Sequence, residues 1–338
     1  MSRAIRSQPK AFRRWRWALA VALVLALLWT LGPRNAFGPH EPSPRAAPPA
    51  DVAQLDAWLA QGEAAQPHLR PDTAKRVGWH GAPGQRTPWA VVYLHGFTAT
   101  RLETAPLAQH LAQQLGANLF ETRLTGHGAD AQAMGDATVQ DWLADTVEAV
   151  QVGQRLGERV LLLGVSTGAT LGNWLALQPL GQAVAAQVWV SPNYGPAVKR
   201  SELINGPWGQ QIALALEGEM RGQPTNDPRE NNAWTQRYPT KALFPMMALV
   251  KQVRESDLSA VRTPVLVLYS PADQTVDANE TVLAFARLGS PLKVLEPVAY
   301  SEATGQHVLA GDIRAPKATA PMAERMAQWV KALPAAQP

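Results

Sequence analysis

From residue 51 onward the chain alternates short apolar runs with stretches of helical periodicity, and this alternation restricts its fold more than any other feature. The runs have the length and the Val and Leu content of buried strands. They lie at residues 89–94, 118–123, 160–163, 187–190, 263–269 and 293–297. Between them apolar residues recur at helical spacing, as in Val139 and Trp142 behind the potential N-cap Thr138. Strands separated by helices predict an α/β fold with a mostly parallel, doubly wound sheet that has helices on both faces.

A short glycine-containing motif, Gly164-Val-Ser166-Thr-Gly168, follows the expected strand at 160–163 and opens an apolar helix. This strand–turn–helix context is the one that a serine nucleophile on a sharp turn requires. Glycines two residues to either side leave room for neighbouring backbone, and the start of a helix favours developing negative charge. We therefore interpret Ser166 as a nucleophile, and Gly164 and Gly168 as the glycines of its turn.

A serine nucleophile needs a base, and the base needs an acid that orients it. His307 is the only histidine after Ser166 in the sequence, so it is the predicted base. The acid should follow a strand that comes after the nucleophile. Asp273 is the first acidic residue beyond the strand that ends at Tyr269, and Asp277, four residues on, remains the alternative.

The oxyanion of such a reaction needs two backbone N–H groups. Thr167, directly after the nucleophile, offers one of them. Phe97 offers the other, in the loop His95-Gly96-Phe97 that follows the first core strand. We interpret His95 and His127 as residues that pack the loops rather than as catalytic groups.

The composition excludes several kinds of site. The chain has no cysteine, which excludes a thiol nucleophile, a Cys-ligated metal and a disulfide framework. Its net charge of +4 is uneven, because residues 1–16 hold six bases and no acid while the rest holds 25 bases and 27 acids. No basic stripe with interleaved aromatic residues follows, so no nucleic-acid partner is expected. We expect a small-molecule substrate, no cofactor and no metal.

Residues 17–32, directly after those bases, are uncharged and strongly apolar. A helix of this length just reaches across a bilayer core, and Arg34 is the only base close behind it. The asymmetry predicts a cytoplasmic segment at 1–16, a membrane anchor at 17–32 and a periplasmic, extracytoplasmic remainder. Cleavage of a signal peptide, which would leave a soluble periplasmic protein, is the alternative. Six prolines in residues 33–50 predict a stiff, extended linker before a folded domain at 51–338.

Taken together, five motifs resemble the α/β-hydrolase superfamily. They are His95-Gly-Phe-Thr-Ala, Arg123-Leu-Thr-Gly-His-Gly128, Gly164-Val-Ser-Thr-Gly168, Ser270-Pro-Ala-Asp273 and Gln306-His307. Over about residues 75–335 the chain is most similar to the bacterial carboxylesterase and monoglyceride-lipase-like group with a serine aminopeptidase domain. The resemblance implies the triad Ser166, Asp273 and His307, the oxyanion donors Phe97 and Thr167, and a cap inserted at about 193–260. Thr167 and Ala169 depart from the residues common in that group, which bears on substrate choice and leaves the catalytic groups in place.

The expected cap combines bulky apolar residues with many Asn and Gln residues; the bulky ones are Trp208, Trp234, Phe244, Met246 and Met247. This mixture suits an ester with a small or medium acyl group, although the same side chains could form the core of the cap. We therefore predict a serine hydrolase that cleaves carboxylic esters through an acyl-enzyme. The alternatives are an aminopeptidase or amidase, a lysophospholipase or monoacylglycerol lipase on the same triad, and a non-catalytic, membrane-anchored binding or assembly protein.

Overall fold

Buried runs of Val and Leu form the central sheet of the protein, whose computed structural model describes residues 10–334. Within this range the sheet has seven strands in the order β1-β3-β2-β4-β5-β8-β9. Their bounds are Arg76–Gly78 (β1), Thr87–Leu94 (β2), Asn118–Glu121 (β3), Gly157–Val165 (β4), Val184–Val190 (β5), Val265–Tyr269 (β8) and Lys293–Pro297 (β9). Neighbouring strands are parallel except β1 and β3. The predicted parallel sheet is therefore confirmed, and it gains an antiparallel edge strand that the sequence analysis missed.

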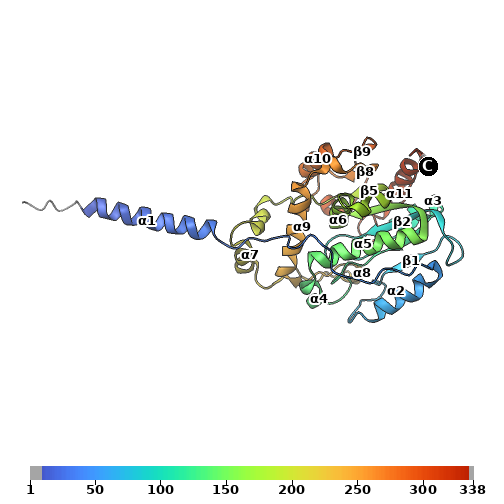
Figure 1. Cartoon of the computed structure of the whole chain (residues 1–338), viewed down its shortest axis with the longest axis horizontal. Helices are drawn as coiled ribbons and strands as arrows, with labels where there is room; N and C mark the ends of the chain where they lie inside the picture. Colours follow the sequence, from blue (N-terminus) through green and yellow to red (C-terminus); the bar gives the residue numbers. More distant parts are fainter. Residues whose placement is uncertain (1–9, 335–338) are drawn as a thin grey trace, which may run out of the picture.

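Helices cover both faces of this sheet (Figure 1). On one face lie α3 (Leu107–Leu115) and α11 (Pro316–Lys331). The other face carries α2 (Leu55–Ala64), α5 (Val139–Leu156), α6 (Thr167–Ala176) and α10 (Ala278–Arg287). Successive residues of β2 alternate between the two cores, since Val91 belongs to the first and Val92 to the second.

The helix α5 shows how local sequence sets these elements. The hydroxyl of Thr138 accepts a hydrogen bond from the amide of Asp141, and the Asp141 carboxylate accepts one from the amide of Thr138. This reciprocal pair satisfies backbone donors that the first helical turn leaves unpaired. Val139 and Trp142, from the apolar stripe predicted from the sequence, face the core and are buried.

A long insertion separates β5 from β8, at the place where the resemblance implies a cap. It contains η3 (Lys199–Asn205), α7 (Gly209–Glu217), β6 (Met220–Arg221), α8 (Pro228–Ala233), β7 (Tyr238–Pro239), η4 (Thr240–Ala242), α9 (Leu243–Glu255) and η5 (Leu258–Ala260). The two short strands pair with each other, outside the main sheet. The helix α9 packs against α6, the helix that begins directly after Ser166. The insertion is thereby placed over the carboxyl ends of the strands.

The proline-rich segment at 33–50, predicted as a stiff, extended linker, makes contacts with the folded domain. It lacks helix, but its polar groups bind the folded domain at several points. The Asn35 amide donates to the carbonyl of Phe244 (2.8 Å), and the Ser43 hydroxyl donates to Asp141 (2.8 Å). The Arg45 guanidinium binds the carboxylate of Asp145 at 2.6 Å. The segment is therefore a strap along the domain, and the contacts of the folded unit begin before residue 51.

The apolar segment at 17–32 lies mostly within α1 (Lys10–Thr30), which projects away from the rest of the protein in Figure 1. Across residues 10–334, every helix is too short or too polar to cross a membrane. The predicted membrane anchor is therefore not supported. Part of the predicted basic segment, at residues 1–9, lies outside the described residues. The location inferred from the charge asymmetry stays a prediction.

Candidate active site

Ser166 lies on a sharp turn between β4 and α6. Its backbone has φ 52° and ψ −117°, in a region that residues with a side chain rarely occupy. The glycines on either side of it relieve crowding. A Cβ on Gly164 would lie 2.7 Å from the backbone of Ala169, and one on Gly168 would lie 2.1 Å from the carbonyl oxygen of Leu94. Both glycines are thus required by the close approach of neighbouring backbone.

The structure brings Ser166, His307 and Asp273 together from three separate segments. The Nε2 atom of His307 lies 3.0 Å from Ser166 Oγ, and its Nδ1 atom lies 2.7 Å from Asp273 Oδ2. The Asp273 side chain is only 2% exposed. A carboxylate at Nδ1 favours the tautomer with the proton on Nδ1, which leaves Nε2 free to accept the proton of the serine hydroxyl.

Of the two candidate acids, Asp273 is the one whose carboxylate contacts His307. Its second oxygen, Oδ1, accepts hydrogen bonds from the amides of Thr275 (2.7 Å) and Val276 (3.0 Å). Asp277 instead caps α10 and pairs with Lys199 at 2.5 Å. The ammonium group of Lys199 lowers the pKa of Asp277 below its usual value. Asp277 therefore has a structural role that keeps it away from His307.

Two further residues hold the histidine loop, and the sequence analysis missed both. The Ser191 hydroxyl, at the end of β5, donates to the carbonyl of His307 (2.7 Å). The Gln306 side chain accepts from the hydroxyl of Ser270 (3.0 Å) and donates to two carbonyls of its own loop. Gln306 links the loop of His307 to the loop of Asp273. Its place next to the predicted base was the only sequence signal for this role.

The loop that carries Phe97 is fixed by His95. The Nε2 atom of His95 accepts a hydrogen bond from the amide of Leu124 (3.0 Å), so its Nδ1 atom carries the proton and donates to the carbonyl of Gly96 (2.9 Å). Burial lowers the pKa of His95 to about 4, which keeps the ring neutral. The amide of Ala99 also donates to the Gly96 carbonyl (3.2 Å). Because a trans peptide points its C=O and N–H in opposite directions, these bonds also fix the direction of the Phe97 amide.

The other predicted oxyanion donor, Thr167, is the first residue of α6, so its amide has no partner within the helix. The ring of Phe97 packs edge-on against His127 and Tyr238, with centroids 6.1 Å and 5.6 Å apart. Burial lowers the pKa of His127 well below its usual value, and its Nδ1 atom hydrogen-bonds the carbonyl of Thr125 at 3.1 Å. His127 thus packs against the ring of Phe97.

Two cavities bear on the search for a binding site, and one of them adjoins the residues described above. The first, of about 490 Å³, lies between the insertion and the loop of Phe97 and has a mainly apolar wall. Its residues include Phe97, Ile204, Ile212, Ala213, Leu243, Met246, Met247 and Thr275. Of the bulky cap residues singled out in the sequence, only Met246 and Met247 line it. The cavity thus borders both the loop of Phe97 and the turn that holds Asp273.

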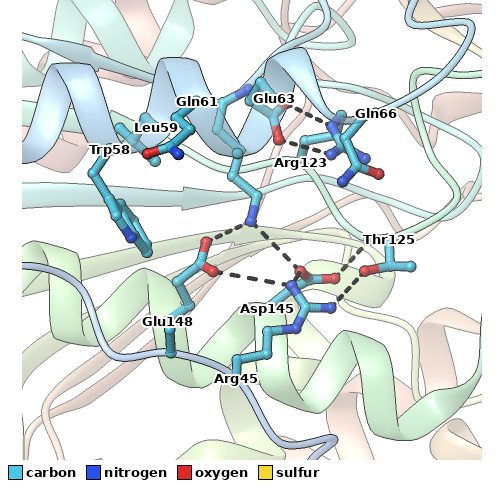
Figure 2. Close-up of a pocket in the computed structure, with 13 residues that line it drawn as sticks. Arg45, Trp58, Leu59, Gln61, Glu63, Gln66, Arg123, Thr125, Asp145 and Glu148 are labelled. Carbon is cyan, nitrogen blue, oxygen red and sulfur yellow. Dashed lines mark hydrogen bonds and ion pairs between the residues drawn. The ribbon is translucent and has the colours of Figure 1, made fainter.

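The second cavity, of about 440 Å³, is strongly charged and lies under the strap (Figure 2). Arg45 and Lys75 both approach Asp145 and Glu148, and Arg123 binds Glu63 through two hydrogen bonds of 2.7 and 2.8 Å. Its cations and carboxylates satisfy one another, which fits a structural network better than a ligand site. Across residues 10–334, no group of three or more His, Asp or Glu side chains is placed to hold a metal.

Comparison with known proteins places this geometry in a family. Residues 85–302 match the family Hydrolase_4, described as serine aminopeptidase, S33. The thermostable monoacylglycerol lipase of Bacillus sp. (strain H-257) is 24% identical over 214 residues, which cover 61% of this chain and 79% of that protein. A structure from the metagenome-derived lipolytic enzymes LipS and LipT is similar with a TM-score of 0.59 and 20% identity, and covers 78% of this chain and 99% of its own.

A soluble variant of monoglyceride lipase from Saccharomyces cerevisiae also has this fold, with a TM-score of 0.56 and 16% identity over 76% of this chain and 90% of its own. At these identities the structural likeness shows the α/β-hydrolase fold. The family match extends over more than half of the chain and includes the turn of Ser166 and the loop of Phe97. The chain therefore belongs to the serine aminopeptidase S33 family and has the α/β-hydrolase fold.

Proposed function

We propose that this protein is a serine hydrolase that cleaves carboxylic esters, with Ser166 as nucleophile, His307 as base and Asp273 as the acid that orients the base. The contact that carries the proposal is the 3.0 Å approach of His307 Nε2 to Ser166 Oγ. It lies within hydrogen-bonding reach, as transfer of the serine proton requires. The carboxylate of Asp273 also stabilises the imidazolium that this transfer creates.

The proposed reaction has two halves. In the first, Ser166 Oγ bonds to the carbonyl carbon, its proton passes to His307 Nε2, and the carbonyl electron pair moves onto oxygen. The amides of Phe97 and Thr167 stabilise that oxyanion. The intermediate then breaks the C–O bond to the alcohol, which leaves with the proton from His307. In the second half, water attacks the acyl-enzyme with His307 as base, and the acid and free Ser166 are released.

The apolar cavity supports a substrate with a single small or medium acyl chain. Its volume of about 490 Å³ falls within the range of small-molecule sites, and its wall is mostly aliphatic. The relatives described as monoacylglycerol lipases support the same class of substrate. We therefore propose monoacyl esters, including monoacylglycerols, as substrates.

The carboxylates of the cap favour esters over peptides with a free amine. Glu202 binds the guanidinium of Arg254 through both of its oxygens, at 2.6 and 3.1 Å. Glu217 lines the cavity, but it is exposed, and the wall there also contains Arg200 and Arg221. Among the described residues that line the cavity, none is a buried carboxylate that could bind an amine, so aminopeptidase activity is the second candidate.

Turnover of nitrophenyl esters of increasing acyl length, of a monoacylglycerol and of an amino-acid nitroanilide tests this proposal. We expect the esters to be hydrolysed and the nitroanilide to react at least 100-fold more slowly. Ala213→Phe should fill part of the cavity and lower kcat/KM for the nitrophenyl esters with longer acyl chains about 10-fold, while kcat/KM for nitrophenyl acetate should change little. Leu214→Phe, next to it on α7 but outside the cavity wall, is the matched control. A protein that prefers the nitroanilide, or an acyl preference that Ala213→Phe leaves unchanged, would contradict the proposal.

A further inference from the structure

One buried carboxyl group beside the proposed oxyanion hole has no part in the triad. Glu103 lies in the loop between β2 and α3 and is 2% exposed. Its Oε1 atom accepts a hydrogen bond from the amide of Gly96 (2.7 Å) and another from the hydroxyl of Tyr93 (2.8 Å). Among the ion pairs of residues 10–334, none includes Glu103. A carboxyl group buried without a cation is costly, so it calls for a local role.

The position of Gly96 gives that role a direction. A Cβ on Gly96 would lie 3.0 Å from Glu103 Oε2 and 3.3 Å from Ser166 Cβ, so the carboxyl group and the serine both lie against this glycine. Glu103 holds the N–H of Gly96, while His95 and Ala99 hold its C=O. The glycine is thus fixed at both of its backbone polar groups, and the next amide along the chain is that of Phe97.

We propose that Glu103 is a positioning residue for ester hydrolysis, which anchors Gly96 so that the Phe97 amide faces the oxyanion. This inference rests on the proposed function of Ser166 and Phe97. Without the carboxyl group, the Gly96 amide loses its acceptor and the loop can rotate about the two bonds that flank the glycine. An oxyanion donor that is displaced by an ångström loses much of its effect.

The protonation state of Glu103 adds a readout that a merely structural residue would not have. Burial raises the pKa of Glu103 to about 8, while the hydrogen bonds from Gly96 and Tyr93 oppose that rise. At pH 7 the group is therefore mainly neutral, and above pH 8 it becomes an anion next to the oxyanion hole. The titratable residues on the surrounding segments are Tyr93, His95, Arg101, Glu121 and Asp312, and of these only Tyr93 hydrogen-bonds to the carboxyl group.

Three variants separate the contributions, each measured for kcat and KM on a nitrophenyl ester and for thermal unfolding. Glu103→Ala removes the acceptor, and we expect kcat to fall 10- to 100-fold with KM within about 2-fold. Glu103→Gln keeps an acceptor oxygen without the charge, and it should retain most of kcat at pH 7. Tyr93→Phe removes the other hydrogen bond to Glu103 and leaves that of Gly96, so kcat should change less than about 3-fold.

The pH profile completes the test. We expect kcat of the wild type to decline above about pH 8, and Glu103→Gln to lose this decline. Full kcat in a folded Glu103→Ala, or the same alkaline decline in Glu103→Gln, would overturn the role of Glu103. If Glu103→Ala does not fold, the profile of Glu103→Gln and the kcat of Tyr93→Phe still decide the matter. A wild type without ester turnover would instead overturn the proposed function itself.

Discussion

The substitution Asp273→Asn tests the proposed triad through the tautomer of His307. In the structure Asp273 Oδ1 accepts two backbone amides, those of Thr275 and Val276, while Oδ2 faces His307 Nδ1 at 2.7 Å. An asparagine must keep its carbonyl oxygen on the two amides, because its NH₂ group cannot accept from them. Its NH₂ group then faces His307 Nδ1.

That orientation reverses the tautomer of the base. An NH₂ donor at Nδ1 requires an unprotonated Nδ1, so the ring proton moves to Nε2, which faces Ser166. The histidine can then no longer accept the serine proton. By analogy with the same change in serine proteases, we expect kcat to fall about 10⁴-fold, which corresponds to about 5 kcal/mol of activation free energy.

The assay is steady-state hydrolysis of a nitrophenyl ester by Asp273→Asn and by the control Asp277→Asn. Asparagine is as good an N-cap as aspartate, and the pair that Asp277 forms with Lys199 is partly exposed, so the control should keep at least half of the wild-type kcat. Thermal unfolding of both variants shows that they are folded. The reasoning is refuted if Asp273→Asn keeps a tenth of wild-type kcat, or if Asp277→Asn is the inactive variant.

Three further predictions use stability as the readout. Deletion of residues 1–32 should leave the thermal unfolding temperature nearly unchanged. Deletion of residues 1–50, or the substitution Arg45→Ala, should lower the free energy of unfolding by about 1–3 kcal/mol, because the buried carboxylate of Asp145 loses a charged hydrogen-bond donor. Gly168→Ala should cost about 3 kcal/mol or more in a denaturant titration, since its Cβ would lie 2.1 Å from the carbonyl oxygen of Leu94, and an unchanged midpoint would contradict this. As the pH rises from about 5 to about 8, the free energy of unfolding of the wild type should fall relative to that of Glu103→Gln, by up to about 1.4 kcal/mol per pH unit. The reason is the raised pKa of Glu103, because the folded wild type holds a proton that the unfolded chain releases. Unfolding curves at both pH values check the sign, and a difference that is constant with pH would refute it.

The strands and the turn of Ser166 could be predicted because their signals are local. Each core strand is a continuous apolar run, and the turn has glycines at fixed offsets from the serine. The edge strand β1 was missed because it has only three residues, all of them at least partly exposed. A strand this short and polar has no periodic pattern to detect.

Contacts between distant segments could not be predicted from sequence. Arg45 and Asp145 are 100 residues apart, so the composition of 33–50 predicted a stiff, extended linker but not the contacts that hold it against the domain as a strap. The choice of Asp273 over Asp277 depends on a loop that returns His307 to the first of them. The role of Glu103 depends in the same way on the path of the Gly96 backbone. At 17–32, the apolar run predicted an anchor that no helix within residues 10–334 supports.

The central claim is that Ser166 is an activated nucleophile, and covalent labelling with a fluorophosphonate probe tests it most directly. The wild type should react, and mass spectrometry should locate the adduct on the peptide that contains Ser166. Ser166→Ala should remain unlabelled and folded, and its ester turnover should fall about 10³-fold or more. Labelling at another residue, or a Ser166→Ala variant that retains a tenth of the wild-type turnover, would contradict the account.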